Sequence, residues 1–189
     1  MTFFNHLDLS ATIIEKLPIE LKALVNLKWL DLDYSWDLHK IPHQLISHFL
    51  KMNVLRMLHC GYGYSPSGQA ITEDTVLYSG GELLLEELLN LKYLNVWSIC
   101  FRSSSALGKF LRSAKLQIST QFLCLHCFDD SKSLNVLALA YLNHLHTLNI
   151  HSCKYLEELK IENVQNSQPY YSQTLYTVGI YMIAPNSGT

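Results

Sequence analysis

The sequence predicts an α/β leucine-rich-repeat solenoid, a horseshoe with short parallel strands on the concave side and short helices or turns on the convex side. The first observation behind this prediction lies in the stretch Leu24 to Leu38. There Leu27, Leu30 and Leu32 spell L-x-x-L-x-L, a pattern in which the strand leucines point into the core and the residues between them point out.

The second observation is a period. Leu7-Asp8-Leu9 recurs 23 residues later as Leu30-Asp31-Leu32, and Leu17-Pro18 recurs at nearly the same shift as Ile41-Pro42. Two independent landmarks at one period indicate a true repeat. A proline at these positions suits the start of a short convex helix or turn, because its missing N–H is not needed there.

Further copies of the strand pattern follow along the chain. We expect a third strand around Leu55, with Cys60 at the position where the repeat turns a small side chain inward. The fourth, fifth and sixth strands are expected at Leu91–Val96, Phe122–Leu125 and Leu145–Ile150, with Phe128 and Cys153 at inward-turning positions. About six repeats therefore fill residues 3–162.

Other segments connect these strands. Residues 61–81 are rich in Gly, Ser and Pro and predict an inserted loop. Glu82 to Asn90 predicts a helix with Glu86 and Glu87 exposed, and 103–115 predicts another, while 134–142 is expected to form a convex connection.

The C-terminal part departs from the period. Leu156, Leu159 and Ile161 suggest the start of a further repeat, but 163–189 is an unpatterned tail in which 175–183 could form a strand. A repeat array normally ends in capping repeats with a polar outer face. The sequence shows neither cap, so we expect a fragment of a longer array.

Composition excludes several classes of protein. The 189 residues are 49% hydrophobic and 16% charged with a net charge of −2, which argues against a disordered tail and against attraction to nucleic acid or membranes. No apolar run approaches the roughly 18 residues of a membrane span. The cysteine count of five is odd, and only Cys124 and Cys127 are close in sequence, so a disulfide framework is not expected. Together with the absence of a signal peptide and of an N-x-[ST] sequon, this favours a cytoplasmic protein with reduced thiols.

Motifs for chemistry are weak. Gly108-Lys109 lacks the glycine and the hydroxyl residue of a P-loop, and Gly61-x-Gly63 lacks the helix of a dinucleotide site. A metal-like grouping does occur among residues of the C-terminal half, namely Cys124, His126, Cys127, His144, His146, His151 and Cys153. No second C-x-x-C follows the first, so structural thiols are the preferred interpretation, and we expect no metal, no cofactor and no enzyme activity.

The concave face carries the functional prediction. Residues between and just after strand leucines should line it in rows about 4.8 Å apart, and aromatic and Arg side chains on such a surface are typical binding anchors. The candidate partner-binding residues are Trp29, Asp31, Asp33, Tyr34, Arg56, His59, Tyr93, Asn95 and Trp97. Asp8, Ser10, Phe122, Cys124, His126, Thr147, Asn149 and His151 are expected on the same face. The alternative is that some of these side chains only cover imperfect packing.

Two segments resemble a known family. LDLSATIIEKLPIELKALVNLKWLDLDYSWDLHKIP and HLHTLNIHSCKYLEELKI are similar to the repeat region of plant intracellular immune receptors of the coiled-coil, nucleotide-binding, leucine-rich-repeat class. The resemblance implies recognition of a pathogen effector or a guarded host protein, and restraint of a nucleotide-binding module. The coiled coil and the nucleotide-binding module themselves have no counterpart in this sequence.

Two alternatives stay open. The chain could be a generic repeat scaffold, such as a ubiquitin-ligase adaptor that presents substrates, although no F-box-like segment precedes the repeats. A small hydrolase or metal enzyme would need a convergent site that the sequence does not reveal.

Overall fold

A computed structural model describes residues 4–61, 75–126, 128, 130–135, 139, 142, 144–160 and 177–181. The strands are β1 (His6–Asp8), β2 (Trp29–Asp31), β3 (Val54–Arg56), β4 (Val96–Phe101), β5 (Thr120–His126), β6 (Ser133–Asn135), β7 (Thr147–His151), β8 (Glu158–Lys160) and β9 (Thr177–Tyr181). The α-helices are α1 (Glu82–Leu89), α2 (Ser104–Leu111) and α3 (Ala114–Ser119), and short 3-10 helices are η1 (Ile19–Ala23), η2 (Ile46–His48) and η3 (Tyr78–Gly81).

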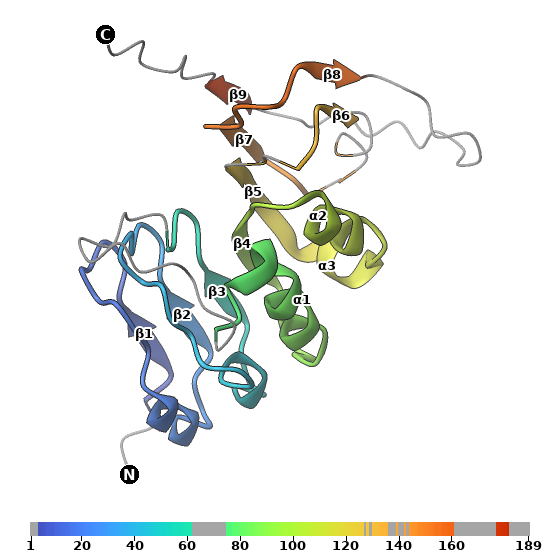
Figure 1. The fold of residues 1–189 in the computed structure, drawn as a ribbon. Helices are drawn as coiled ribbons and strands as arrows, with labels where there is room; N and C mark the ends of the chain where they lie inside the picture. Colours follow the sequence, from blue (N-terminus) through green and yellow to red (C-terminus); the bar gives the residue numbers. More distant parts are fainter. Residues whose placement is uncertain are drawn as a thin grey trace, which may run out of the picture.

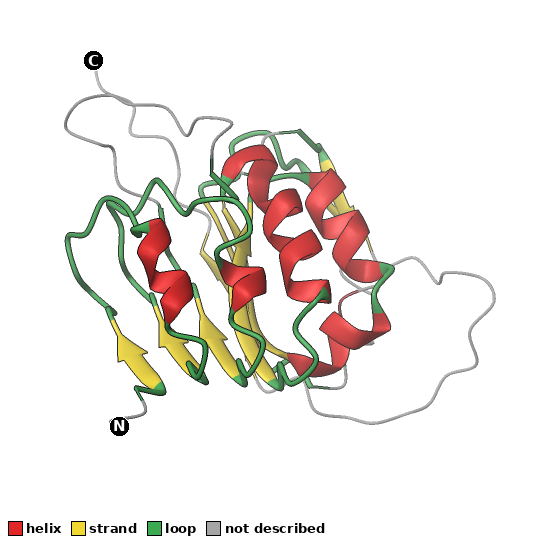
Figure 2. Ribbon diagram, turned by 90° about the horizontal axis from the view of Figure 1, so that it is seen from below, coloured by secondary structure: helices red, strands yellow, loops and turns green. Residues whose placement is uncertain are grey.

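The fold is α/β with a parallel sheet. Seven strands lie in the order β1-β2-β3-β4-β5-β7-β9, and each neighbouring pair is parallel (Figure 1). Figure 2 shows that the helices gather on one face of these strands. We call the opposite face, which carries Trp29, Asp31 and Arg56, the open face.

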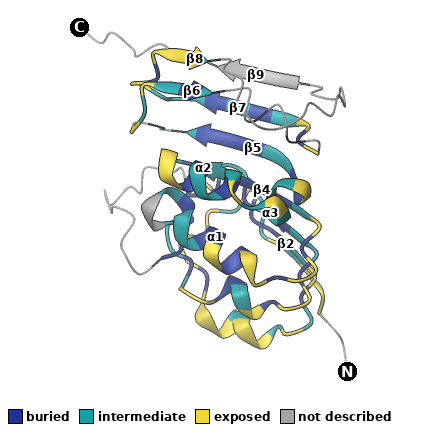
Figure 3. Ribbon diagram, turned by 90° about the vertical axis from the view of Figure 1, so that its right-hand side faces the viewer, coloured by how far each residue is buried: buried dark blue, intermediate teal, exposed yellow. Residues whose placement is uncertain are grey.

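One row of apolar residues joins the first four strands on the helix side. Leu7 pairs with Leu30, Leu30 with Leu55, and Leu55 with Trp97. Leu30, Leu55 and Trp97 are buried, and Leu7 on the edge strand is partly buried. The core therefore lies between the sheet and the helices. Figure 3 colours buried residues dark blue along the strands and exposed residues yellow on turns of the helices.

A left-handed turn follows four of the strands at one equivalent position. Ala11, Tyr34, His59 and Ser152 have φ between 52° and 62°, and each lies two residues after the second apolar residue of its strand segment. The next residue turns inward after three of these turns: Ser35 and Cys60 are buried, and Cys153 packs against the core. The inward positions of Cys60, Phe128 and Cys153 were predicted from the spacing and are confirmed.

The fourth strand differs from the prediction. It spans Val96–Phe101, and Trp97 rather than Leu94 pairs with Leu55. The predicted pattern of Leu91, Leu94 and Val96 was therefore three residues out of register. Leu91 and Leu94 are still buried, but in the turn before the strand, so apolar spacing alone did not separate the two alignments.

The helices confirm two predictions and correct one. The segment expected at 82–90 forms α1, and 103–115 contains α2 followed by the start of α3. Glu86 is exposed as expected, but Glu87 is buried. Its carboxylate accepts hydrogen bonds from the backbone N–H of Gln44 and of Ser47 at the start of η2.

The C-terminal part adds strands to the main sheet and forms a second, two-stranded sheet. Ser133–Asn135, expected in a convex connection, forms β6 and pairs with β8 in a separate two-stranded sheet. Leu159 lies in β8 and so does not continue the main sheet. Thr177–Tyr181, inside the range predicted to form a strand, is β9 beside β7. Residues 62–74 of the predicted inserted loop and most of 161–189 lie outside the described residues.

Candidate functional site

Six of the nine predicted binding residues lie on the open face or in the turns at its carboxyl edge: Trp29, Asp31, Asp33, Tyr34, Arg56 and His59. They are brought together because the strands are parallel and in register, so that Asp8, Asp31 and Arg56 form one row across β1, β2 and β3. Parallel strands end at the same edge, which places the following turns side by side.

Arg56 connects two of these side chains. Its guanidinium lies 5.3 Å from the ring centroid of Trp29, and one of its nitrogens lies 3.7 Å from a carboxylate oxygen of Asp31. The other flank of the indole belongs to His6, whose ring stacks on it at 5.2 Å. Trp29 is therefore held in a fixed orientation and is partly exposed, as a binding anchor would be.

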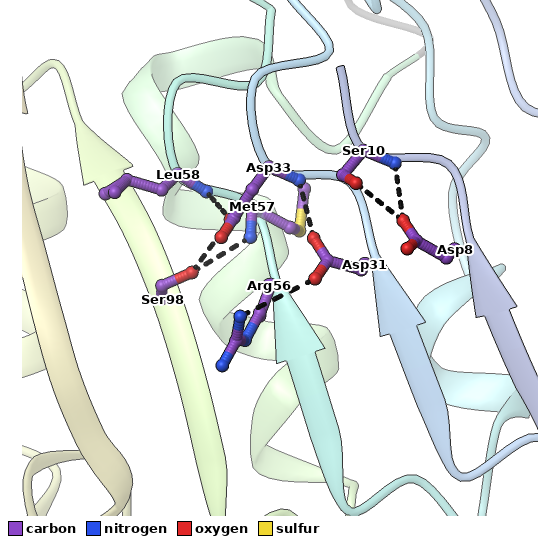
Figure 4. A network of polar contacts seen from close by, with 8 residues as sticks. All are labelled: Asp8, Ser10, Asp31, Asp33, Arg56, Met57, Leu58 and Ser98. Carbon is purple, nitrogen blue, oxygen red and sulfur yellow. Dashed lines mark hydrogen bonds and ion pairs between the residues drawn. The ribbon is translucent and has the colours of Figure 1, made fainter. Parts of the chain in front are cut away.

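Asp33 is a structural carboxylate. It accepts a hydrogen bond from the backbone N–H of Leu58 at 2.6 Å and another from the hydroxyl of Ser98 at 3.2 Å (Figure 4). Burial raises the pKa of this carboxyl above its ordinary value of 3.8, and the charge of Asp31 adds to the rise, while the hydrogen bonds from Leu58 and Ser98 oppose it. Asp33, in the turn after β2, thus forms hydrogen bonds to the turn after β3 and to strand β4.

Asp8 and Asp31 repeat a local motif one strand apart. Each accepts a hydrogen bond from the backbone N–H two residues later, which belongs to Ser10 after Asp8 and to Asp33 after Asp31 (Figure 4). This Asx arrangement satisfies the carboxylates locally and shapes the turn that follows each strand. The acidic residues of the open face are therefore used within the fold.

An exposed aromatic pair lies next to this network. Tyr34 and Trp36 are each 45% exposed, and their rings lie 5.2 and 5.3 Å from that of His59. Trp36 was not among the predicted site residues. The sequence shows a second aromatic residue two positions after Tyr34, which could have indicated Trp36. The strand pattern used to select candidate residues ends before this position.

The fifth and seventh strands add a group of histidines and a cysteine. Cys124 is fully buried, and its Sγ lies 3.2 Å from Nε2 of His151. The ring of His151 lies 4.5 Å from that of His126 and 5.2 Å from that of His59. Cys124, His126 and His151 were all expected on this face; sequence alone did not indicate that His59 would reach them.

Burial governs the protonation of these histidines. It lowers the pKa of His126 to about 3, with repulsion from His151, Arg102 and His59 adding to the effect. Burial also lowers the pKa of His59, where His151 contributes, and that of His151. The three imidazoles are neutral at physiological pH.

Three predicted residues are not part of this face. Trp97 is 1% exposed, packs against Phe110 and donates its indole N–H to the backbone oxygen of Leu116 at 3.1 Å, so it belongs to the core beneath α2 and α3. Tyr93 and Asn95 precede β4 and are exposed. The three-residue register error accounts for all three, and Val96, Ser98 and Cys100 occupy the corresponding strand positions.

Other residues of the metal-like grouping lie apart. His144 and His146 are exposed before β7, and Cys153 bonds to the backbone oxygens of Leu125 and His151. Cys127 lies outside the described residues. A cavity between β3, β4 and η3 measures about 20 Å³, room for a single water and too little for a cofactor.

Comparisons with known proteins point to one kind of relative. The chain is 26% identical over 190 aligned residues to a probable disease resistance protein of Arabidopsis thaliana, an alignment that covers 84% of this chain and 18% of the relative. It therefore spans about a fifth of that protein's length. No family model matches the chain, and no solved structure matches it.

The similarity defines the class only broadly: the chain is similar to a plant disease resistance protein, which supports a role in defence. Within the described ranges, the helices are too short or too polar to cross a membrane.

Proposed function

We propose that this chain is a leucine-rich-repeat segment of a plant disease resistance protein, and that its open face recognises a protein partner. The observation that carries the proposal is the exposed pair Tyr34 and Trp36 beside His59, together with Trp29 and Arg56 on a sheet face that the helices leave uncovered.

The parallel register supports a repeat architecture. Strands β1 to β3 are in register at equivalent leucines, and the left-handed turn recurs at Ala11, Tyr34, His59 and Ser152. Backbone hydrogen bonds also repeat: the N–H of Ala11 donates to Asp33, and that of Tyr34 donates to Leu58, one strand further on. Such a recurrence is expected of a solenoid in which each coil contacts its neighbours, and it supports the proposal.

The chemistry of the face favours a protein over other ligands. Exposed Tyr, Trp and Arg are the side chains that dominate protein interfaces. The net charge of −2 supplies no attraction for nucleic acid, and the acidic residues of the face are already hydrogen-bonded or paired within it.

The proposal extends to regulation. From the family resemblance, the segment acts in the cytoplasm, binds an effector, a guarded host protein or a nucleotide-binding module, and holds that module in its inactive state. This recognition role requires neither an organic cofactor nor catalysis, because the exposed residues of the face are those of recognition.

Proximity labelling in plant leaf cells tests the assigned face. The full chain is expressed as wild type, as the double variant Tyr34→Ala/Trp36→Ala, and as the matched control Leu89→Ala/Ile118→Ala, which removes two exposed side chains from α1 and α3. Proteins labelled by the wild type and the control but lost from the open-face variant are the expected result.

A direct measurement follows with the purified partner, whose affinity should fall by about tenfold or more in the open-face variant. Circular dichroism verifies that all three chains fold. Equal labelling by both double variants, or a loss confined to the helix-face control, contradicts the proposal.

A further inference from the structure

The open face holds a cluster with the chemistry of a metal site. The side-chain donor atoms of His59, Cys124 and His151 all lie within 4.8 Å of one another, and Cys124 Sγ is 3.2 Å from His151 Nε2. The three residues come from the turn after β3, from β5 and from β7. Only the fold brings them together.

The spacing is close to that of a coordinated ion. Zinc binds thiolate at about 2.3 Å and imidazole at about 2.0–2.1 Å, so donors on a tetrahedral ion lie about 3.3–3.8 Å apart. Cys124 and His151 nearly meet this requirement already. A side-chain adjustment of about 1 Å by His59 completes three corners of the tetrahedron.

The surrounding residues fix the orientation of these donors. Tyr34 and Trp36 stack against the ring of His59, and the backbone N–H of His59 donates to Cys100 Sγ at 3.4 Å. On the other side, the ring of His126 lies 4.5 Å from that of His151. Such outer contacts orient metal ligands in known sites.

Burial distinguishes this cluster from a chance surface grouping. Cys124 is fully buried although it lies on the sheet face opposite the helices, and His59 and His151 are half-buried. The thiol is thus enclosed while an imidazole edge remains near solvent. The two half-buried imidazoles are therefore the part of the cluster that solvent reaches.

We propose that His59, Cys124 and His151 bind Zn²⁺, with the Cys124 thiolate and two neutral imidazoles as ligands. One sulfur and two nitrogens suit a borderline-soft transition ion and are poor ligands for Mg²⁺ or Ca²⁺, which require oxygen. The ion links the turn after β3 to β5 and β7 across β4. It stabilises the open face beside Tyr34 and Trp36, and it does not depend on which partner that face binds.

Metal binding is measured on the full chain, purified under reducing conditions and freed of any histidine tag. Equilibrium dialysis against Zn²⁺ should give one tightly held ion per chain. Co²⁺ substituted for zinc should show tetrahedral ligand-field bands in the visible range and a thiolate-to-cobalt charge-transfer band.

Three ligand variants locate the site. His59→Asn keeps a residue that tolerates the left-handed backbone, and His151→Asn and Cys124→Ala remove the other two donors. Each should weaken Zn²⁺ binding by more than about tenfold, and Cys124→Ala should abolish the charge-transfer band. The thermal midpoint of the wild type, but not of the variants, should rise with added Zn²⁺.

Matched controls use similar residues nearby. His146→Asn replaces an exposed histidine just before β7, and Cys153→Ser replaces a thiol outside the cluster. Both should bind as the wild type does. Absence of stoichiometric binding by the wild type, or binding equally strong in His59→Asn and His151→Asn, overturns the proposal. If Cys124→Ala fails to fold, the cobalt spectrum of the wild type and the two histidine variants still test the zinc site.

Discussion

At the residue scale, Asp33 ties several strands of the open face together. Its backbone oxygen accepts the N–H of Ala11 in the turn after β1, and its carboxylate accepts from Leu58 after β3 and from Ser98 in β4. The carboxylate is partly buried with Asp31 nearby, so ionisation is opposed while the hydrogen bonds favour it. Stability should therefore depend on the charge of this one residue.

The pH dependence has a defined sign. The folded-state pKa of Asp33 is raised, so between the ordinary value of 3.8 and the raised value the folded chain binds more protons than the unfolded chain. The contribution of Asp33 to the free energy of unfolding therefore falls as pH rises through this window and is constant above it.

Asp33→Asn removes this titration but retains an oxygen that can accept the Leu58 N–H. We expect the free energy of unfolding of the wild type to fall relative to that of Asp33→Asn as pH rises from about 3.5. Above the raised pKa, the difference between the two free energies should be constant. Urea unfolding at a series of pH values measures both. A difference that moves the other way with pH contradicts the assigned shift.

Two tryptophans show how neighbouring residues decide a side chain's role. Trp29 is flanked by His6 and Arg56 on the open face, whereas Trp97 lies under α2 with its indole N–H bonded to Leu116. Both lie in a strand shortly after a buried leucine, so their local sequences are alike. Only the register of β4 against β3 distinguishes a surface anchor from a core residue.

At the element scale, Glu87 of α1 forms hydrogen bonds to the start of the 3-10 helix η2. Its two carboxylate oxygens accept the N–H groups of Gln44 and Ser47, which lie at the start of η2 where backbone donors have no partner within the helix. Glu87 is buried, whereas Gln44 is exposed and Ser47 is half-buried. Glu86, one residue earlier, is exposed and pairs with Lys109 at the surface.

This contrast gives a matched pair of variants. Glu87→Ala should lower the free energy of unfolding by about 1.5–3 kcal/mol, because two hydrogen bonds to a charged group are lost. Glu86→Ala should change it by less than about 1 kcal/mol, as expected for an exposed ion pair. Chemical denaturation measures both, and equal effects would argue against the capping role of Glu87.

At the scale of the whole molecule, each strand is stabilised by the strands beside it. Leu30 in β2 is fully buried between β1 and β3, whereas Leu7 in the edge strand β1 is partly buried and has one described strand neighbour. A strand that lies between two neighbours gains a stabilising interface on each side, whereas an edge strand gains one. The inner strands should therefore be more sensitive to substitution than the edge.

Leu30→Ala should lower the free energy of unfolding by about 2–5 kcal/mol, because apolar burial is lost and a cavity is left behind. Leu7→Ala should lower it by about 1–2 kcal/mol. Both values are measured on the 189-residue chain by denaturant unfolding. Hydrogen exchange should show greater protection in β2 and β3 than in β1. Similar costs for the two variants would mean that β1 is supported as fully as the inner strands.

The sequence by itself determined the periodic elements. The spacing of Leu7, Leu30 and Leu55 predicted three strands that pair in register, and the composition of 82–90 predicted α1. The inward positions of Cys60 and Cys153 were also predicted from the sequence, because each lies the same number of residues after the corresponding strand leucine. These features depend on local spacing, which a single chain displays directly.

Only the tertiary structure decided which residues share a site. The register of β4, the burial of Trp97 and Glu87, and the meeting of His59 with Cys124 and His151 depend on contacts between segments far apart in the chain. Apolar spacing allowed two alignments of the fourth strand, and packing of Trp97 against Phe110 selected one. Spacing along the chain specified the strands, and packing across it specified the site.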